Sequence, residues 1–315
     1  MITEKLHEML AFVLRNDAGL TEGKSRSLAS YFSSIDEFLS VTKESLANVK
    51  GISGRRTINL TDEEISRIIQ IRNLNYLDTN ASVPQNFLGA LSRAFTKRQM
   101  EMIKSLDLSE LSPNPLLVKA LNIHTPEELV KVNVYMVVTR SIVTSMGFFV
   151  EHLLLASSDS IEKGPRGSGW DLVKKKGGDT HWIQVKSGPN DMDKDQIVYW
   201  SEKITEKINE GDKAYIGMTY GKKTNETVTL GLMKQLLPNW EMKTLVGREL
   251  WDFVSDDPTY HTTLFDTLRR SAQQVLQRRS ICEEIEKCVE RIIGEFTSAY
   301  GAGEKGVLKY IESIF

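Results

Sequence analysis

Cysteine is scarce in this sequence. Only Cys282 and Cys288 occur, six residues apart in a segment with helical periodicity, so their side chains point in different directions and do not readily form a disulfide. This excludes a scaffold held together by disulfides and favours a reduced, cytoplasmic protein.

Long apolar runs are scarce as well. We identify no stretch of about 18 apolar residues, the length that a membrane-spanning helix needs, and residues 1–12 mix acidic with apolar side chains. We therefore expect a soluble intracellular protein with no membrane partner. Hydrophobic residues nevertheless make up 40% of the 315 residues, enough to bury a core and to form two or three units.

The sequence also lacks a large net charge, since its formal charge is -2 at pH 7. Bulk attraction to nucleic acid is therefore excluded, and any contact with DNA must come from local patches. The conspicuous basic segment is 163–176, in which Lys163, Arg166 and Lys174 to Lys176 accompany a single acid, Asp171. Such a run is most often a solvated surface.

Two similar segments, 19–39 and 46–68, each place a glycine-bearing turn before a short helix. The pattern is carried by Gly19, Leu20, Gly23, Lys24, Leu28, Tyr31, Phe32, Ile35, Leu39, Leu46, Val49, Gly51 and Ile52. It resembles a tandem helix-hairpin-helix module of the kind found in DNA-repair proteins. Thr21 and Ser53 depart from the pattern, because a glycine is commonest at their positions.

A helix-hairpin-helix module directs backbone N–H groups at a phosphate from the start of a helix, and glycine permits that close approach. The resemblance implies DNA contacts at Lys24, Lys50, Gly51, Ser53, Gly54, Arg55 and Arg56. In the alternative interpretation, Gly51 merely caps a helix and the module serves only for packing.

The composition changes twice after this module. Residues 76–120 carry Pro84, Pro113 and Pro115 among short helical runs, which we interpret as a connecting region. Residues 121–315 show the helix and strand signals of an α+β unit followed by C-terminal helices.

A helix and a β-hairpin form the most informative part of this unit. Segment 141–158 has one apolar stripe at helical spacing, with Glu151 beside the stripe. Segments 170–176 and 179–188 are typical of strands, and Gly177-Gly178 between them is typical of a two-residue hairpin turn.

The hairpin turn sets the strand register. If Gly177 and Gly178 are the loop residues, Lys176 pairs with Asp179 and Asp171 lies opposite Gln184. Alternation places Lys186 on the same face as Gln184, and Ile183 and Val185 on the other face.

This convergence of an acid, an oxygen donor and an ammonium suits phosphodiester hydrolysis. The Asp171 carboxylate would hold a hard divalent cation such as Mg²⁺, which neutralises charge on the phosphate. Lys186 would hold the attacking water and stabilise the transition state. Taken singly, Asp171, Gln184 and Lys186 could instead be a hairpin-end residue, a surface amide and an edge-strand charge.

Asp171 followed by Gln184-Val185-Lys186 resembles the Asp…(Glu/Asp)-x-Lys signature of the restriction-endonuclease-like, or PD-(D/E)xK, nuclease superfamily. The resemblance implies a mixed β-sheet core flanked by helices. It implies catalysis by Asp171, Gln184, Lys186 and Glu151, and metal ligation by Asp171, Gln184, Val185 and Glu151. Gln184 departs from the pattern because a neutral amide supplies one negative charge fewer. Glu151 is the candidate replacement, since the superfamily often takes an acid from the helix before the hairpin.

Separated blocks at 183–190, Gln196, 217–222 and 247–261 resemble the PmeI-like group of type II restriction endonucleases. The resemblance implies Mg²⁺-dependent, sequence-specific cleavage of double-stranded DNA by a nuclease domain over 121–315. Symmetry favours a homodimer, because a two-fold enzyme matches a palindromic site. We add Arg166 and Gln196 as candidate DNA contacts, although Gln196 fits an ordinary helix surface equally well.

The remaining elements complete a small mixed sheet with helices around it. We expect a helix over 192–208, strands over 213–221 and 226–233, and a long helical stretch over 262–299. Acids at 191, 193 and 195 have a structural reason at a helix start. Two other functions stay open, namely a structure-specific or repair nuclease and a non-catalytic DNA-binding protein with a nuclease fold.

Overall fold

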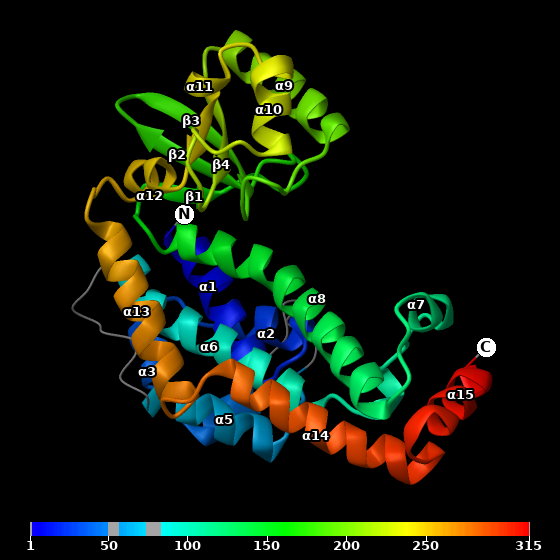
Figure 1. Ribbon diagram of the computed structural model, residues 1–315. Helices are drawn as coiled ribbons and strands as arrows, with labels where there is room; N and C mark the ends of the chain where they lie inside the picture. The colour runs from blue at the N-terminus through cyan, green and yellow to red at the C-terminus, as the bar shows by residue number, and fades with distance from the viewer. Residues whose placement is uncertain (1, 50–56, 74–82, 315) are drawn as a thin grey trace. The chain divides into compact units, whose positions relative to one another are not determined.

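The structure is a computed structural model that describes residues 2–49, 57–73 and 83–314 (Figure 1). The predicted DNA contacts Lys50, Gly51, Ser53, Gly54, Arg55 and Arg56 lie outside the described residues. The chain forms two compact units, Met1–Phe95 with Met146–Ser271 and Thr96–Ser145 with Ala272–Phe315. Every predicted catalytic residue belongs to the first unit.

The first unit begins with helices, namely α1 (Ile2–Asp17), α2 (Glu22–Ala29), α3 (Ile35–Leu39), α4 (Lys43–Ala47) and α5 (Asp62–Asn73). Three of them start at a side-chain cap, in which Thr21, Ser34 or Thr42 accepts a hydrogen bond from the backbone N–H three residues later. These caps explain where the three helices begin.

The predicted mixed sheet is confirmed. Its strands are β1 (Ile161–Lys163), β2 (Leu172–Lys176), β3 (Asp179–Lys186), β4 (Lys213–Met218) and β5 (Thr244–Val246), in the order β1-β2-β3-β4-β5. β2 runs antiparallel to β1 and β3, whereas β4 runs parallel to β3 and β5.

The register of the β2–β3 hairpin is the predicted one. Lys176 pairs with Asp179 and Leu172 with Ile183. Gly177 and Gly178 have φ values of 63° and 89°, so both turn residues adopt the left-handed conformation that glycine accommodates without a steric penalty. The turn chemistry therefore determines which β3 side chains face the start of β2.

Helices cover the two faces of the sheet. On one face, Leu172 and Ile183 share a core with Leu250 and Val254 of α12 (Arg248–Ser255). On the other face, Ile216 packs with residues of α9 (Lys194–Asn209) and α10 (Val228–Leu236). This arrangement buries the middle of the hairpin and leaves the end that carries Asp171 and Lys186 half-buried.

The N-terminal helix shares the core on the α12 side of the sheet. α1 packs against the last turns of α8 (Pro126–Leu155), where the Phe12 ring lies 4.5 Å from the His152 ring. Phe149 of α8 stacks on Phe95 at 4.2 Å. Because Ile183 belongs to the same buried cluster, α1 and α8 are packed into one core with the β2–β3 hairpin.

The expected strand over 226–233 is wrong. Those residues start helix α10, because Thr227 adopts an extended conformation and its side chain accepts a hydrogen bond from Leu230 N. The β-branched residues Thr227, Val228 and Thr229 suggested a strand, but the cap and the burial of Leu230 and Met233 favour a helix. The fifth strand is instead the short segment β5.

Two helical expectations also need correction. The region 76–120 contains one 23-residue helix, α6 (Val83–Ser105), before the short η1 (Leu108–Glu110) and α7 (Pro115–Ala120). Pro84 does not interrupt α6 because it is the second helical residue, where no intrahelical N–H bond is lost. The stretch 262–299 is divided between two helices, since Gln277 and Arg278 have positive φ values.

The last helices are α11 (Trp240–Lys243), α13 (Tyr260–Val275), α14 (Ile281–Tyr300) and α15 (Gly303–Ile314). In the second unit, Ile285, Ile292 and Phe296 of α14 are buried with Leu129 and Val134 of α8. Cys282 is exposed and Cys288 buried, and both are free thiols, as expected.

Helix α8 corrects the expectation that no apolar stretch reaches membrane-spanning length. An 18-residue window of α8 has a mean hydropathy of 1.2. A core helix of a soluble protein also meets this criterion, and α8 buries Phe149 and Leu154 in the first unit and Leu129 and Val134 in the second. Only 22% of that window is buried, so these contacts account for part of its apolar composition.

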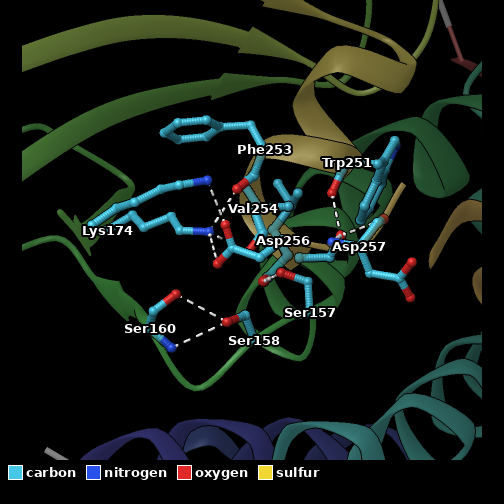
Figure 2. Close-up of polar contacts among 12 residues, drawn as sticks. Ser157, Ser158, Ser160, Lys174, Trp251, Phe253, Val254, Asp256 and Asp257 are labelled. Carbon is cyan, nitrogen blue, oxygen red and sulfur yellow. Dashed lines mark hydrogen bonds and ion pairs between the residues drawn. The ribbon is translucent and has the colours of Figure 1, made fainter. Parts of the chain in front are cut away.

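Lys174 is fully buried, although it belongs to the basic segment of the sequence. Its Nζ donates to the backbone carbonyls of Phe253 (2.6 Å) and Val254 (3.1 Å) and to Oδ2 of Asp256 (2.6 Å) (Figure 2). Both carbonyls lie in the last turn of α12, where the helix dipole favours a cation. Burial lowers the pKa of Lys174, and Asp256 opposes this effect. The hydrogen bonds of this ammonium thereby connect α12 to β2.

Replacing Lys174 tests this attachment. We expect Lys174→Ala to lower the free energy of unfolding by about 3 kcal/mol, because the α12 carbonyls and Asp256 lose a buried donor. Lys175→Ala, at an exposed position of the same strand, should change it by less than about 0.5 kcal/mol. Urea denaturation followed by circular dichroism measures both, and equal effects would contradict the structural role of Lys174.

Candidate active site

Asp171 lies one residue before β2 and reaches across the hairpin to β3. Its Oδ2 accepts a hydrogen bond from the Val185 backbone N–H at 2.7 Å. The backbone of Asp171 is held as well, because its carbonyl accepts a bond from Gly164 N at 2.8 Å. A Cβ on Gly164 would lie 1.9 Å from the Trp170 carbonyl oxygen, so glycine is required for this close approach.

Gln184 is buried on β3, with 8% of its surface exposed. Its Nε2 lies 3.5 Å from the Val185 carbonyl oxygen, and its Oε1 has no hydrogen-bond partner among the described residues. An unpaired buried acceptor costs free energy unless something satisfies it. The amide oxygen is therefore available to a cation.

Lys186 ends β3 two residues beyond Gln184, opposite Met218 of β4. The side chain is half-buried. Its charge acts on Asp171, since Lys186 is one of the groups that lower the pKa of that carboxyl. The predicted acid, oxygen donor and ammonium therefore come from the same end of one hairpin.

Glu151 approaches this group from α8. Its side chain is 17% exposed, and its Oε1 lies 3.2 Å from Nζ of Lys163, the last residue of β1. Glu151 also acts electrostatically on Asp171, because its negative charge raises the pKa of the Asp171 carboxyl. The structure thus brings Glu151 into the electrostatic environment of Asp171, as the sequence predicts.

The pKa of Asp171 is raised to about 6. Burial is the main cause, and the negative charge of Glu151 adds to it. The Val185 N–H bond and the charges of Lys186 and Lys163 act in the opposite direction. Ionisation of Asp171 is unfavourable in the metal-free protein. A cation bound nearby would stabilise the ionised carboxylate, so the electrostatic environment of Asp171 favours metal binding.

The donors around Asp171 fit a hard divalent cation. Asp171 and Glu151 supply carboxylate oxygens, Gln184 an unpaired amide oxygen and Val185 a backbone carbonyl, all of them ligands that Mg²⁺ accepts. No group of three His, Cys, Asp or Glu side chains within residues 2–49, 57–73 and 83–314 is arranged to hold a metal. A metal site at this position therefore requires the Gln184 amide or a backbone carbonyl.

Two charged residues at the site were given no role by the sequence patterns. Lys163 pairs with Glu151, and Nζ of Lys163 also lies 3.3 Å from Oε2 of Glu8 in α1. Lys163 belongs to the basic segment, but its position eight residues before Asp171 carries no motif. Glu8 lies 155 residues from Lys163, and no local signal in the sequence connects them.

The described DNA-contact candidates have different environments. Lys24 lies 2.8 Å from both carboxylate oxygens of Glu64, so its charge is already paired. Arg166 is exposed between β1 and β2. Gln196 is exposed in the first turn of α9, and its backbone N donates to Asp193 at 2.8 Å, which confirms a structural role for that acid.

The raised pKa of Asp171 predicts a pH-dependent stability of the metal-free protein. Because the folded-state value of about 6 exceeds the ordinary value of 3.8, folding favours the protonated acid. The stabilisation is complete below about pH 4 and is lost as the pH rises to about 6. Above pH 6, Asp171→Asn should be more stable than the wild type by about 2 to 3 kcal/mol.

Unfolding free energies of both proteins, measured in EDTA from pH 4 to pH 8, provide the test. A stability difference that is the same at every pH would show that Asp171 does not titrate in this range.

Comparison with known proteins agrees with this geometry. The family model described as Type II restriction endonuclease EcoO109I matches residues 85–275, which is well over half of the chain. The match contains Glu151 and the whole β-sheet, whereas α1 and the other N-terminal helices precede it. No curated protein sequence matches the chain. The predicted endonuclease class is confirmed: the chain belongs to the EcoO109I family of type II restriction endonucleases, which are site-specific deoxyribonucleases.

Proposed function

We propose that this endonuclease cuts double-stranded DNA at a specific sequence with Mg²⁺, and that Asp171, Gln184, Glu151 and Lys186 carry the reaction. The observation that supports the site best is the pairing of the Asp171 carboxylate with the Val185 N–H beside the unpartnered Gln184 oxygen. These groups lie in or directly beside the β2–β3 hairpin, within the range matched by the family model.

Asp171, Glu151, Gln184 Oε1 and the Val185 carbonyl would hold Mg²⁺. When bound, Mg²⁺ would neutralise the negative charge that develops on the scissile phosphate. Lys186, at the same end of β3, would orient the attacking water and stabilise the phosphoryl oxygens through its ammonium. Glu151 would supply the negative charge that Gln184 lacks.

The organisation around the site is part of the same proposal. We assign residues 1–75 to a helix-hairpin-helix module, 76–120 to a helical connection and 121–315 to a PmeI-like nuclease domain. Backbone N–H groups at the start of α2, after Gly19 with φ 72°, would meet a phosphate, with Arg166 and Gln196 as further DNA contacts. A cytoplasmic homodimer would place two sites on a palindromic sequence.

Digestion of unmethylated phage DNA with purified protein and Mg²⁺ tests the activity. Discrete fragments that persist after long incubation are expected. Cleavage confined to branched or damaged DNA would favour a structure-specific repair nuclease. Binding without cleavage in Mg²⁺, Mn²⁺ and Co²⁺ would favour a non-catalytic DNA-binding protein.

Lys186→Ala tests the role of the ammonium. We expect cleavage to slow by at least about 100-fold, because the variant loses charge stabilisation in the transition state. DNA affinity measured in Ca²⁺ should stay close to that of the wild type. Lys305→Ala, an exposed lysine on α15, serves as the control and should cut normally. Full activity of Lys186→Ala would remove Lys186 from the mechanism.

Two substitutions at Gln184 test the metal site. Gln184→Met keeps the size of the side chain but removes the unpaired oxygen, so Mn²⁺ affinity should fall by about tenfold or more, with little loss of metal-free stability. Gln184→Glu restores the usual acid and should tighten Mn²⁺ binding while destabilising the metal-free protein through repulsion from Asp171. Isothermal titration calorimetry measures the affinities. Unchanged affinity in both variants would place the metal elsewhere.

A further inference from the structure

An ion-pair chain connects the N-terminal helices to the candidate active site. The Lys163 ammonium bridges Oε1 of Glu151 at 3.2 Å and Oε2 of Glu8 at 3.3 Å. The other oxygen of Glu8 lies 3.1 Å from Nη1 of Arg26 in α2. Both oxygens of Glu8 are therefore engaged, which fixes the carboxylate in the orientation that meets Lys163.

Helix α1 is held against the α8–β1 junction by more than this pair. The Lys5 ammonium donates to the backbone carbonyls of Ser158 and Ile161, the latter at 2.9 Å. Phe12 packs on His152, the residue after Glu151. Positions 5, 8 and 12 lie on one face of α1, so a single helical face contacts α8, β1 and the connection between them.

The two carboxylates of this chain are more shielded from solvent than the lysine between them. The side chains of Glu151 and Glu8 are 17% and 21% exposed, and that of Lys163 is 40% exposed. Burial acts to raise the pKa of Glu8, but Lys163 and Arg26 outweigh it and lower the value. Burial likewise acts to lower the pKa of Lys163, but Glu151 and Glu8 outweigh it and raise the value.

We propose that Lys163 is a positioning residue for Glu151, and that Glu8 of α1 completes the support, so that the N-terminal helix forms part of the metal-binding machinery. The inference rests on the proposed role of Glu151 as a metal ligand. Lys163 directs one Glu151 oxygen and screens its charge from Asp171, which allows two carboxylates to share the site before a metal arrives. The family match begins at residue 85 and includes neither α1 nor Glu8.

The same geometry permits an opposite role, in which the Lys163 ammonium competes with the metal for Glu151. The two roles predict opposite signs. Removal of a positioning residue weakens metal binding, whereas removal of a competing cation strengthens it. Mn²⁺ affinity in the absence of DNA therefore decides between them and does not depend on turnover.

The experiment is an isothermal titration of Mn²⁺ into the full-length protein. Lys163→Ala should weaken binding by about tenfold, as expected for a residue that orients a metal ligand. Lys163→Arg should recover most of the affinity, because it keeps the cation. Glu8→Gln should produce a smaller loss in the same direction. The matched controls Glu4→Gln, an exposed acid on α1, and Lys175→Ala should bind as the wild type does.

Unchanged or tighter Mn²⁺ binding by Lys163→Ala and Glu8→Gln would overturn the inference. If Lys163→Ala does not fold, the comparison of Glu8→Gln with Glu4→Gln decides the question in the same way. Asp171→Asn separates this result from a failure of the proposed function. If Asp171→Asn loses Mn²⁺ binding while Lys163→Ala and Glu8→Gln bind as the wild type does, only the positioning role is contradicted. If Asp171→Asn binds Mn²⁺ with wild-type affinity, the metal site itself is contradicted.

Discussion

The hydrogen bond from the Val185 backbone N–H to the Asp171 carboxylate is the contact on which the candidate site depends. It joins the start of β2 to the end of β3, and it forms only because the Gly177-Gly178 turn sets the strands in this register. The absence of a side chain at Gly164 lets β1 close against the Asp171 backbone. Three backbone constraints thus hold one carboxylate beside Gln184 and Lys186.

Electrostatics at the site is a balance between two carboxylates and two ammonium groups. Asp171 is buried and further opposed by Glu151, while Lys186 and Lys163 reduce that cost. An acid in place of Gln184 would add a third negative charge to a site that already disfavours ionisation of Asp171. The neutral amide avoids this cost and still presents a free oxygen, which is a physical reason for a glutamine to serve at this position.

The scaffold uses buried charges as well as apolar packing to place the hairpin. Lys174 fastens α12 to β2, and Lys5 fastens α1 to the segment before β1. Lys174 donates to two backbone carbonyls at the end of α12, and Lys5 donates to the carbonyls of Ser158 and Ile161 near the start of β1. These attachments help to pack α1, α8 and α12 against one face of the sheet and leave the end near Asp171 and Lys186 half-buried.

The sequence alone determined the features that depend on residues close together in the chain. Glycine conformation set the hairpin register, alternation placed Gln184 and Lys186 together, and helical periodicity identified the helix that carries Glu151. Tertiary structure decided the rest. Residues 226–233 have the β-branched residues of a strand, yet capping and burial make them helical. The Glu8–Lys163 pair spans 155 residues, so only the packing of α1 on the α8–β1 junction could bring its charges together.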